Sequence, residues 1–117
     1  MFRRRNILSN SDTDIFADSE RKKQDHIIQL KAQISKQRQA LDQMKSEFHL
    51  AQRTYHHLGD ILDNNTSLTE IQRMLLRSRQ EDTLHVMRQT NTIQQQLLEA
   101  KILGMEREVE LLSSEMI

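Results

Sequence analysis

Apolar side chains recur at alternating steps of three and four residues from Ile27 to Leu62. A period of 3.5 residues keeps one narrow stripe of a helix turned toward a partner helix, which is the pattern of a coiled coil. We call this stripe the first seam, and it predicts a helix over about residues 19–62. Its a and d positions are Ile27, Leu30, Ile34, Gln37, Leu41, Met44, Phe48, Ala51, Tyr55, Leu58 and Leu62.

Residues 63–67, Asp-Asn-Asn-Thr-Ser, collect poor helix formers and good capping residues. Ser67 followed by Glu70 matches a capping box, in which each side chain accepts a hydrogen bond from the other residue's backbone N–H. We therefore expect a helix to end here, followed by a turn and a new helix. A kinked but continuous helix is the alternative.

The apolar pattern from residue 68 to 116 is less regular. Leu68, Ile71 and Leu75 open it, and its weakest part lies between Arg77 and Asp82. Two later series are offset from each other by one residue, which indicates a change of local winding or a handover between partner helices. The first of these series is Val86, Thr90, Ile93 and Leu97. The second, which we call the second seam, is Leu98, Ile102, Met105, Val109, Leu112 and Met116.

The flanks of the two predicted helices carry opposite charges. Beside the first seam lie the bases Lys31, Arg38 and Lys45, and beside the second seam lie the acids Glu99, Glu106, Glu108 and Glu115. Folding the chain back at residues 64–65 brings the two flanks together. That fold predicts three ion pairs: Lys31 with Glu99, Lys22 or Lys23 with Glu106, and Arg21 with Glu108.

The predicted fold class is therefore all-α, with two long helices in an antiparallel coiled-coil hairpin over residues 19–117. The alternative is one long kinked helix within a multi-chain helical bundle. The composition agrees with long helices, because the chain has no proline, two glycines and only 3% aromatic residues. Residues 1–18 have no sustained period and are expected to form a flexible arm, although helix is able to begin near Asp12.

Charge and composition also exclude several classes of function. The 17 basic and 17 acidic residues cancel, which argues against a general nucleic-acid binder, and the absence of cysteine excludes disulfides and thiolate metal sites. No apolar run approaches the roughly 20 residues that span a bilayer. We expect a soluble, cytoplasmic protein with no transmembrane segment.

No candidate catalytic, cofactor or metal site emerges from the sequence. The five histidines show no spacing that suits a shared metal ion, and there is no glycine-rich phosphate loop. Within the arm, Ser9 and Ser11 are each followed three residues later by an aspartate. Phosphate there would lie near Arg3–Arg5, which gives a hypothesis of a regulated docking arm.

The sequence predicts a non-catalytic coiled-coil scaffold or adaptor that binds other coiled-coil proteins in a hetero-oligomer. The first-seam flanks do not favour self-pairing, because base would meet base in an antiparallel homodimer of this helix. The partner-binding residues are expected to be Ile27, Leu30, Ile34, Leu41, Met44, Phe48, Tyr55, Leu58, Leu98, Ile102, Met105, Val109 and Leu112.

Further docking is expected through apolar residues outside the seams, namely Leu50, Ile61, Leu76 and Leu103. Two other functions are consistent with the same pattern. One is a SNARE-like or vesicle-tethering helix in membrane traffic, and the other is a small helical secretion or assembly chaperone.

Overall fold

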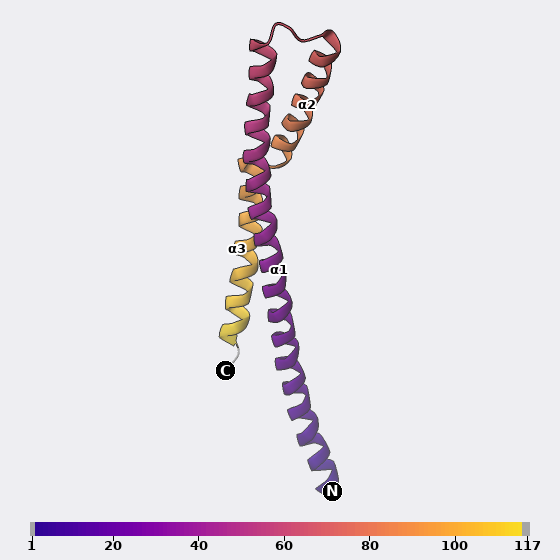
Figure 1. The fold of residues 1–117 in the computed structure, drawn as a ribbon. Helices are drawn as coiled ribbons and strands as arrows, with labels where there is room; N and C mark the ends of the chain where they lie inside the picture. Colours follow the sequence, from indigo (N-terminus) through magenta and orange to yellow (C-terminus); the bar gives the residue numbers. More distant parts are fainter. Residues whose placement is uncertain (1, 116–117) are drawn as a thin grey trace. The chain divides into compact units, whose positions relative to one another are not determined.

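The computed structural model describes the backbone of residues 2–115 and the side chains of residues 15–115. It contains three helices: α1 spans Phe2–Asn64, α2 spans Glu70–Gln89 and α3 spans Thr92–Glu115 (Figure 1). No strand occurs in the described backbone. The fold is an all-α, hairpin-like arrangement in which α2 and α3 together form the second arm, so the predicted fold class is confirmed.

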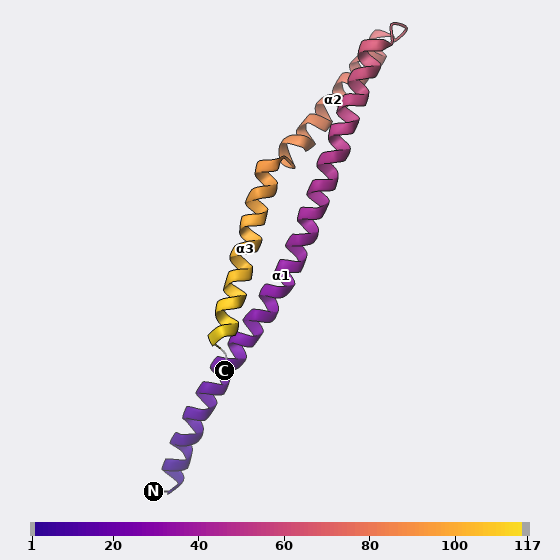
Figure 2. The ribbon, with the colours of Figure 1, turned by 90° about the vertical axis from the view of Figure 1, so that its left-hand side faces the viewer.

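The chain divides into two compact units. Unit 1 combines Met1–Lys36 with Ile102–Ile117, and unit 2 is Gln37–Lys101. In unit 1 the end of α3 lies beside α1, and in unit 2 α2 runs back along α1 (Figures 1 and 2). The pairing is antiparallel in each unit, because contacts with lower-numbered residues of α1 involve higher-numbered residues of the second arm.

The first seam is the buried face of α1, as the 3.5-residue period predicts. Leu30, Ala51 and Leu58 are each 6% exposed, and every other seam position is buried or half-buried. Apolar residues outside the stripe, such as Ile28 and Leu50, remain exposed on the same helix. Spacing, rather than hydrophobicity alone, therefore determines which apolar residues of α1 are covered.

The loop between the arms covers residues 65–69 and overlaps the predicted break at 63–67. The capping box is formed by Thr69 and Gln72 rather than by Ser67 and Glu70. Thr69 Oγ1 accepts a hydrogen bond from the Gln72 backbone N–H at 3.1 Å, and Gln72 Oε1 accepts one from the Thr69 N–H at 2.9 Å. Ser67 instead stabilises the turn by donating its N–H and its hydroxyl to Asn65 Oδ1.

The prediction of one continuous second helix over 68–116 is wrong. The helix is interrupted at Thr90 and Asn91, not in the weak stretch between Arg77 and Asp82. The interruption is a joint in which one helix ends and the next begins, and both ends have their own caps.

Several hydrogen bonds hold this joint, among them three made by side chains of Thr90, Asn91 and Gln95. Thr90 Oγ1 donates to the Val86 carbonyl at 2.7 Å, which closes the end of α2. Asn91 Oδ1 accepts from the Gln94 N–H at 3.0 Å, which caps the start of α3. Gln95 Nε2 reaches back to the Thr90 carbonyl at 2.8 Å. Thr90 is 6% exposed and its hydroxyl is satisfied, so the joint lies within the packed interface rather than on the surface.

At the other end of the chain, α1 begins at Phe2, so the predicted helix start near residue 19 is too late. The flexibility predicted for residues 1–18 is a separate property and stays a prediction. The phosphorylation hypothesis for Ser9 and Ser11 concerns side chains that lie outside the described residues.

Truncating a seam residue should cost much more stability than truncating an exposed leucine of the same helix. We expect Leu41→Ala, at an 8% exposed position, to lower the free energy of unfolding by about 2 to 3 kcal/mol through lost burial and a residual cavity. Leu50→Ala, at a 60% exposed position, should cost less than about 0.5 kcal/mol. Urea unfolding followed by circular dichroism measures both, and equal losses would contradict the assignment of the seam as the core.

Candidate partner-binding surfaces

The predicted partner-binding residues are all covered within their own chain. Whether a second chain also contacts them stays a prediction. The buried ones are Ile27, Leu30, Leu41, Leu58 and Ile102. The half-buried ones are Ile34, Met44, Phe48, Tyr55, Leu98, Met105, Val109 and Leu112.

The basic flank of α1 meets the acidic flank of α3, as predicted, but with different partners. In unit 2, Lys45 Nζ lies 3.6 Å from Glu99 Oε1, so Glu99 pairs with Lys45 rather than with Lys31. In unit 1, His26 Nε2 lies 3.0 Å from Glu108 Oε1, in the place predicted for Arg21. The loop at 65–69 turns later than the assumed fold-back at residues 64–65, which accounts for the change from Arg21 to His26 but not for the larger change from Lys31 to Lys45.

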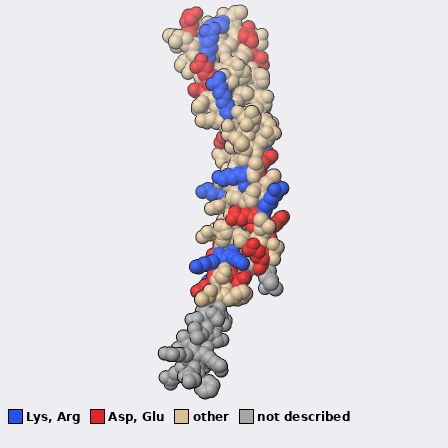
Figure 3. Space-filling view, turned by 180° about the vertical axis from the view of Figure 1, so that it is seen from behind, with Lys and Arg blue, Asp and Glu red and all other residues tan. Residues whose placement is uncertain are grey.

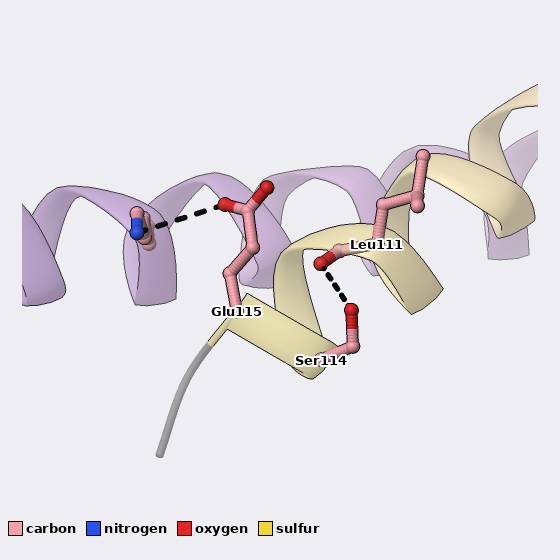
Figure 4. A network of polar contacts seen from close by, with 4 residues as sticks. Leu111, Ser114 and Glu115 are labelled. Atoms are coloured by element: carbon pink, nitrogen blue, oxygen red, sulfur yellow. Dashed lines mark hydrogen bonds and ion pairs between the residues drawn. The ribbon is translucent and has the colours of Figure 1, made fainter.

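The last turn of α3 is attached to α1 by a similar pair. Glu115 extends from α3 toward α1, where its Oε2 lies 3.6 Å from Lys23 Nζ (Figure 4). The predicted pairing of Lys22 or Lys23 with Glu106 stays a prediction. Beside it, the Ser114 hydroxyl donates to the Leu111 carbonyl at 2.8 Å, within α3 itself.

The two Lys–Glu ion pairs and the hydrogen-bonded contact of His26 with Glu108 align the helices more than they stabilise them. Their side chains are between 31% and 57% exposed, and exposed pairs of this kind contribute only about 0.2 to 1 kcal/mol each. Basic and acidic side chains also intermix on the face drawn in Figure 3, so that face has no broad area of a single sign. On this face, charge therefore acts through local pairing rather than through one strong field.

The orientation of α2 is set by polar contacts at the loop. Arg73 turns toward α1, where its Nη1 donates to the Leu62 carbonyl at 3.3 Å and its Nη2 to the Asn65 carbonyl at 3.1 Å. Carbonyls at the end of a helix lack partners within the helix, so a guanidinium is well suited to satisfy them. Placing Arg73 on the inner face fixes which side of α2 faces α1.

A second contact farther along α2 fixes the same face. Gln80 Nε2 donates to the Tyr55 carbonyl at 3.5 Å, beside Gly59 of α1. A Cβ added at Gly59 would lie 3.3 Å from this nitrogen, so the glycine leaves room for the amide. The inner face of α2 thus includes two polar anchors, Arg73 and Gln80, and none of the residues of α2 is buried.

Three large apolar residues near the start of α2 nevertheless face solvent. Ile71, Met74 and Leu75 are 70%, 65% and 66% exposed, and we call these three residues the α2 patch. The prediction that Ile71 and Leu75 open the second arm's seam is wrong, because the polar anchors turn the helix the other way. The sequence shows that these residues are spaced three and four apart, but this spacing does not specify whether α1 covers them.

The four residues predicted to lie outside the seams divide into two pairs. Leu50 and Leu103 are exposed, at 60% and 59%. Ile61 and Leu76 are half-buried, and Leu76 shares the inner face of α2 with Arg73. The exposed apolar surface is therefore distributed differently from the prediction, with its densest group on α2.

The part of the chain that the structure describes has no group of three or more His, Cys, Asp or Glu residues arranged to hold a metal ion. None of its helices is long and apolar enough to cross a membrane. No protein-family model matches the chain, and neither the curated proteins nor the solved structures contain a match.

Removing the Arg73 anchor should loosen α2. We expect Arg73→Ala to lower the free energy of unfolding by about 1 to 2 kcal/mol, because two carbonyls lose a charged donor at a partly exposed position. Hydrogen exchange at the amides of α2 should accelerate more than exchange in α3. Arg79→Ala, at an exposed position of the same helix, serves as the control and should change neither quantity measurably.

Proposed function

We propose that this protein is a non-catalytic coiled-coil adaptor subunit of an intracellular multiprotein assembly. Its partner would be an amphipathic helix of another chain, docked on the α2 patch. The observation that supports this most is the orientation of α2, which exposes three large apolar side chains while none of its own residues is buried. A helix with such an uncovered apolar group gains stability when a partner covers it.

The size of the patch suits a helix-in-groove contact. Ile71, Met74 and Leu75 span one turn at spacings of three and four residues, which is the spacing of the residues through which one helix packs against another. Fully burying each such side chain is worth roughly 1.5 to 3 kcal/mol before the costs of association. The patch is bordered by both signs of charge, with Glu70 and Arg77 nearby, which allows flank charges to select the partner's direction.

The seams offer a less direct interface. A partner helix that used the first seam would have to displace α2 or α3, because these helices already cover it. The α2 patch needs no such displacement. The antiparallel fold and the joint at Thr90–Asn91 also give less support to the membrane-traffic alternative, in which a long continuous helix joins a parallel bundle. An assembly chaperone would use the same patch but would exchange its partner.

The test is the double substitution Ile71→Asp and Leu75→Asp in the full chain. We expect a partner that copurifies in fixed ratio with the wild-type protein to be lost, because two buried carboxylates would replace apolar contacts. Leu50→Asp, which places the same charge at an exposed site of α1, should retain that partner. Circular dichroism should show unchanged helix content in both variants, since all three positions are exposed.

A partner that the double substitution does not release would contradict the proposal.

A further inference from the structure

The loop between α1 and α2 contains a serine that is followed by an acidic residue with no role in capping. Ser67 and Glu70 match a capping box in the sequence, but Thr69 and Gln72 form the box that caps α2. Ser67 is exposed in the loop, and Glu70 is exposed at the first position of α2. A serine followed three residues later by a carboxylate is also a charge pattern that acidophilic protein kinases recognise.

The structure distinguishes this serine from the others that share the pattern. An aspartate or glutamate follows three residues after Ser9, Ser11, Ser67 and Ser78. Ser9 and Ser11 belong to α1 and Ser78 to α2, whereas Ser67 lies in the loop. Kinases bind the segment around the acceptor in an extended form, which an exposed loop can adopt without unfolding a helix. The fold therefore favours Ser67 as the acceptor over Ser78.

Ser67 and the anchor Arg73 both bind Asn65. The Ser67 N–H and hydroxyl donate to Asn65 Oδ1 at 3.1 and 2.7 Å. Arg73 Nη2 donates to the Asn65 carbonyl at 3.1 Å, and Arg73 Nη1 donates to the Leu62 carbonyl at 3.3 Å. A negative charge added to Ser67 would therefore lie close to the guanidinium that attaches α2 to the end of α1.

We propose that Ser67 is a phosphorylation site, and that phosphate there draws Arg73 away from the carbonyls of Leu62 and Asn65. In the reaction, the Ser67 hydroxyl gives its proton to the base of the kinase, and its Oγ attacks the γ-phosphorus of ATP. The Oγ–P bond forms, the bond from this phosphorus to the bridging oxygen breaks, and ADP leaves. The product no longer has the hydroxyl donor that bonds to Asn65 Oδ1.

The change of partner for Arg73 follows from the strength and the position of the two contacts. A phosphate binds a guanidinium more strongly than a neutral carbonyl does, because the hydrogen bonds join opposite charges. The bond from Arg73 to Leu62 joins α2 to α1, whereas a bond to phosphate on Ser67 would join α2 only to its own preceding loop. Phosphorylation would therefore release α2 from the end of α1. The helix itself would persist, because an anion before its first turn is favourable.

This proposal adds regulation to the adaptor function and rests on it only for the intracellular location, where protein kinases act. The α2 patch lies on the helix that would be released, so phosphate would change how the patch is presented to a partner. Phosphate incorporation and helix distances are both measured on the full chain without a partner. Their failure would leave docking on the α2 patch measurable, and a failure of that docking would leave them unchanged.

Phosphate incorporation tests the site. The full chain is incubated with an acidophilic serine/threonine kinase, ATP and Mg²⁺, and the modified residues are assigned by mass spectrometry. We expect phosphate on Ser67 and none on Ser78. Glu70→Gln should lower incorporation at Ser67 severalfold, because it removes the recognised carboxylate and leaves the cap formed by Thr69 intact. An unmodified Ser67, or equal phosphate on Ser78, would overturn the assignment.

Distances between the two helices test the release of α2. The chain has no cysteine, so Arg53→Cys on α1 and Arg79→Cys on α2 each accept one spin label at an exposed position. Phosphate placed on Ser67 by genetically encoded phosphoserine should broaden the distance distribution measured by pulsed electron paramagnetic resonance. Arg73→Ala should broaden it similarly, and phosphate should then add nothing, because both changes act through one guanidinium. Ser67→Ala, which removes the hydroxyl without adding charge, should leave the distribution narrow.

Three results would overturn the release mechanism. The first is an unchanged distance distribution in the phosphorylated chain, and the second is broadening by phosphate that persists in Arg73→Ala. The third is a loss of helix content by circular dichroism, which would mean that phosphate unfolds α2 rather than releasing it.

Discussion

The structure depends on the burial of one stripe of α1. A helix of this length has no stable tertiary structure by itself, and most helical stability in proteins comes from packing an apolar face. The first seam supplies that face, and the segments of the second arm cover it in each unit. Because the stripe is narrow, only a few of its residues become buried, among them Leu30 and Leu41. The remaining apolar side chains are left for contacts outside the hairpin.

Polar contacts determine the orientation of α2, which the apolar pattern does not specify. The side of α2 that faces α1 combines half-buried apolar residues, such as Leu76 and Met87, with the polar residues Arg73 and Gln80. Arg73 satisfies carbonyls at the end of α1 and in the loop, and in this orientation Ile71, Met74 and Leu75 stay exposed. An unsatisfied carbonyl at a helix end has a cost comparable to the gain from burying one aliphatic side chain. The orientation of α2 is thus a balance between terms of similar size.

This balance explains how much the sequence could predict. The first seam was predictable position by position, because a strict 3.5-residue period over many turns admits one buried face. The overall fold and the meeting of opposite flanks were also predictable. The joint at Thr90–Asn91 was not, although Asn91 followed by Gln94 offered a cap that could have been recognised. The α2 patch depended on hydrogen bonds to loop carbonyls, whose positions no periodic pattern specifies.

The joint at Thr90–Asn91 also has a consequence for cooperativity. α2 has a cap of its own at each end, formed by Thr69 with Gln72 and by Thr90 with Val86. α2 is therefore a separate helical segment. It is held by the polar anchors Arg73 and Gln80, and none of its own residues is buried. Such a segment can open and close while the coiled coil of α1 and α3 persists. Local opening is thus expected to begin at α2, before α3 separates from α1.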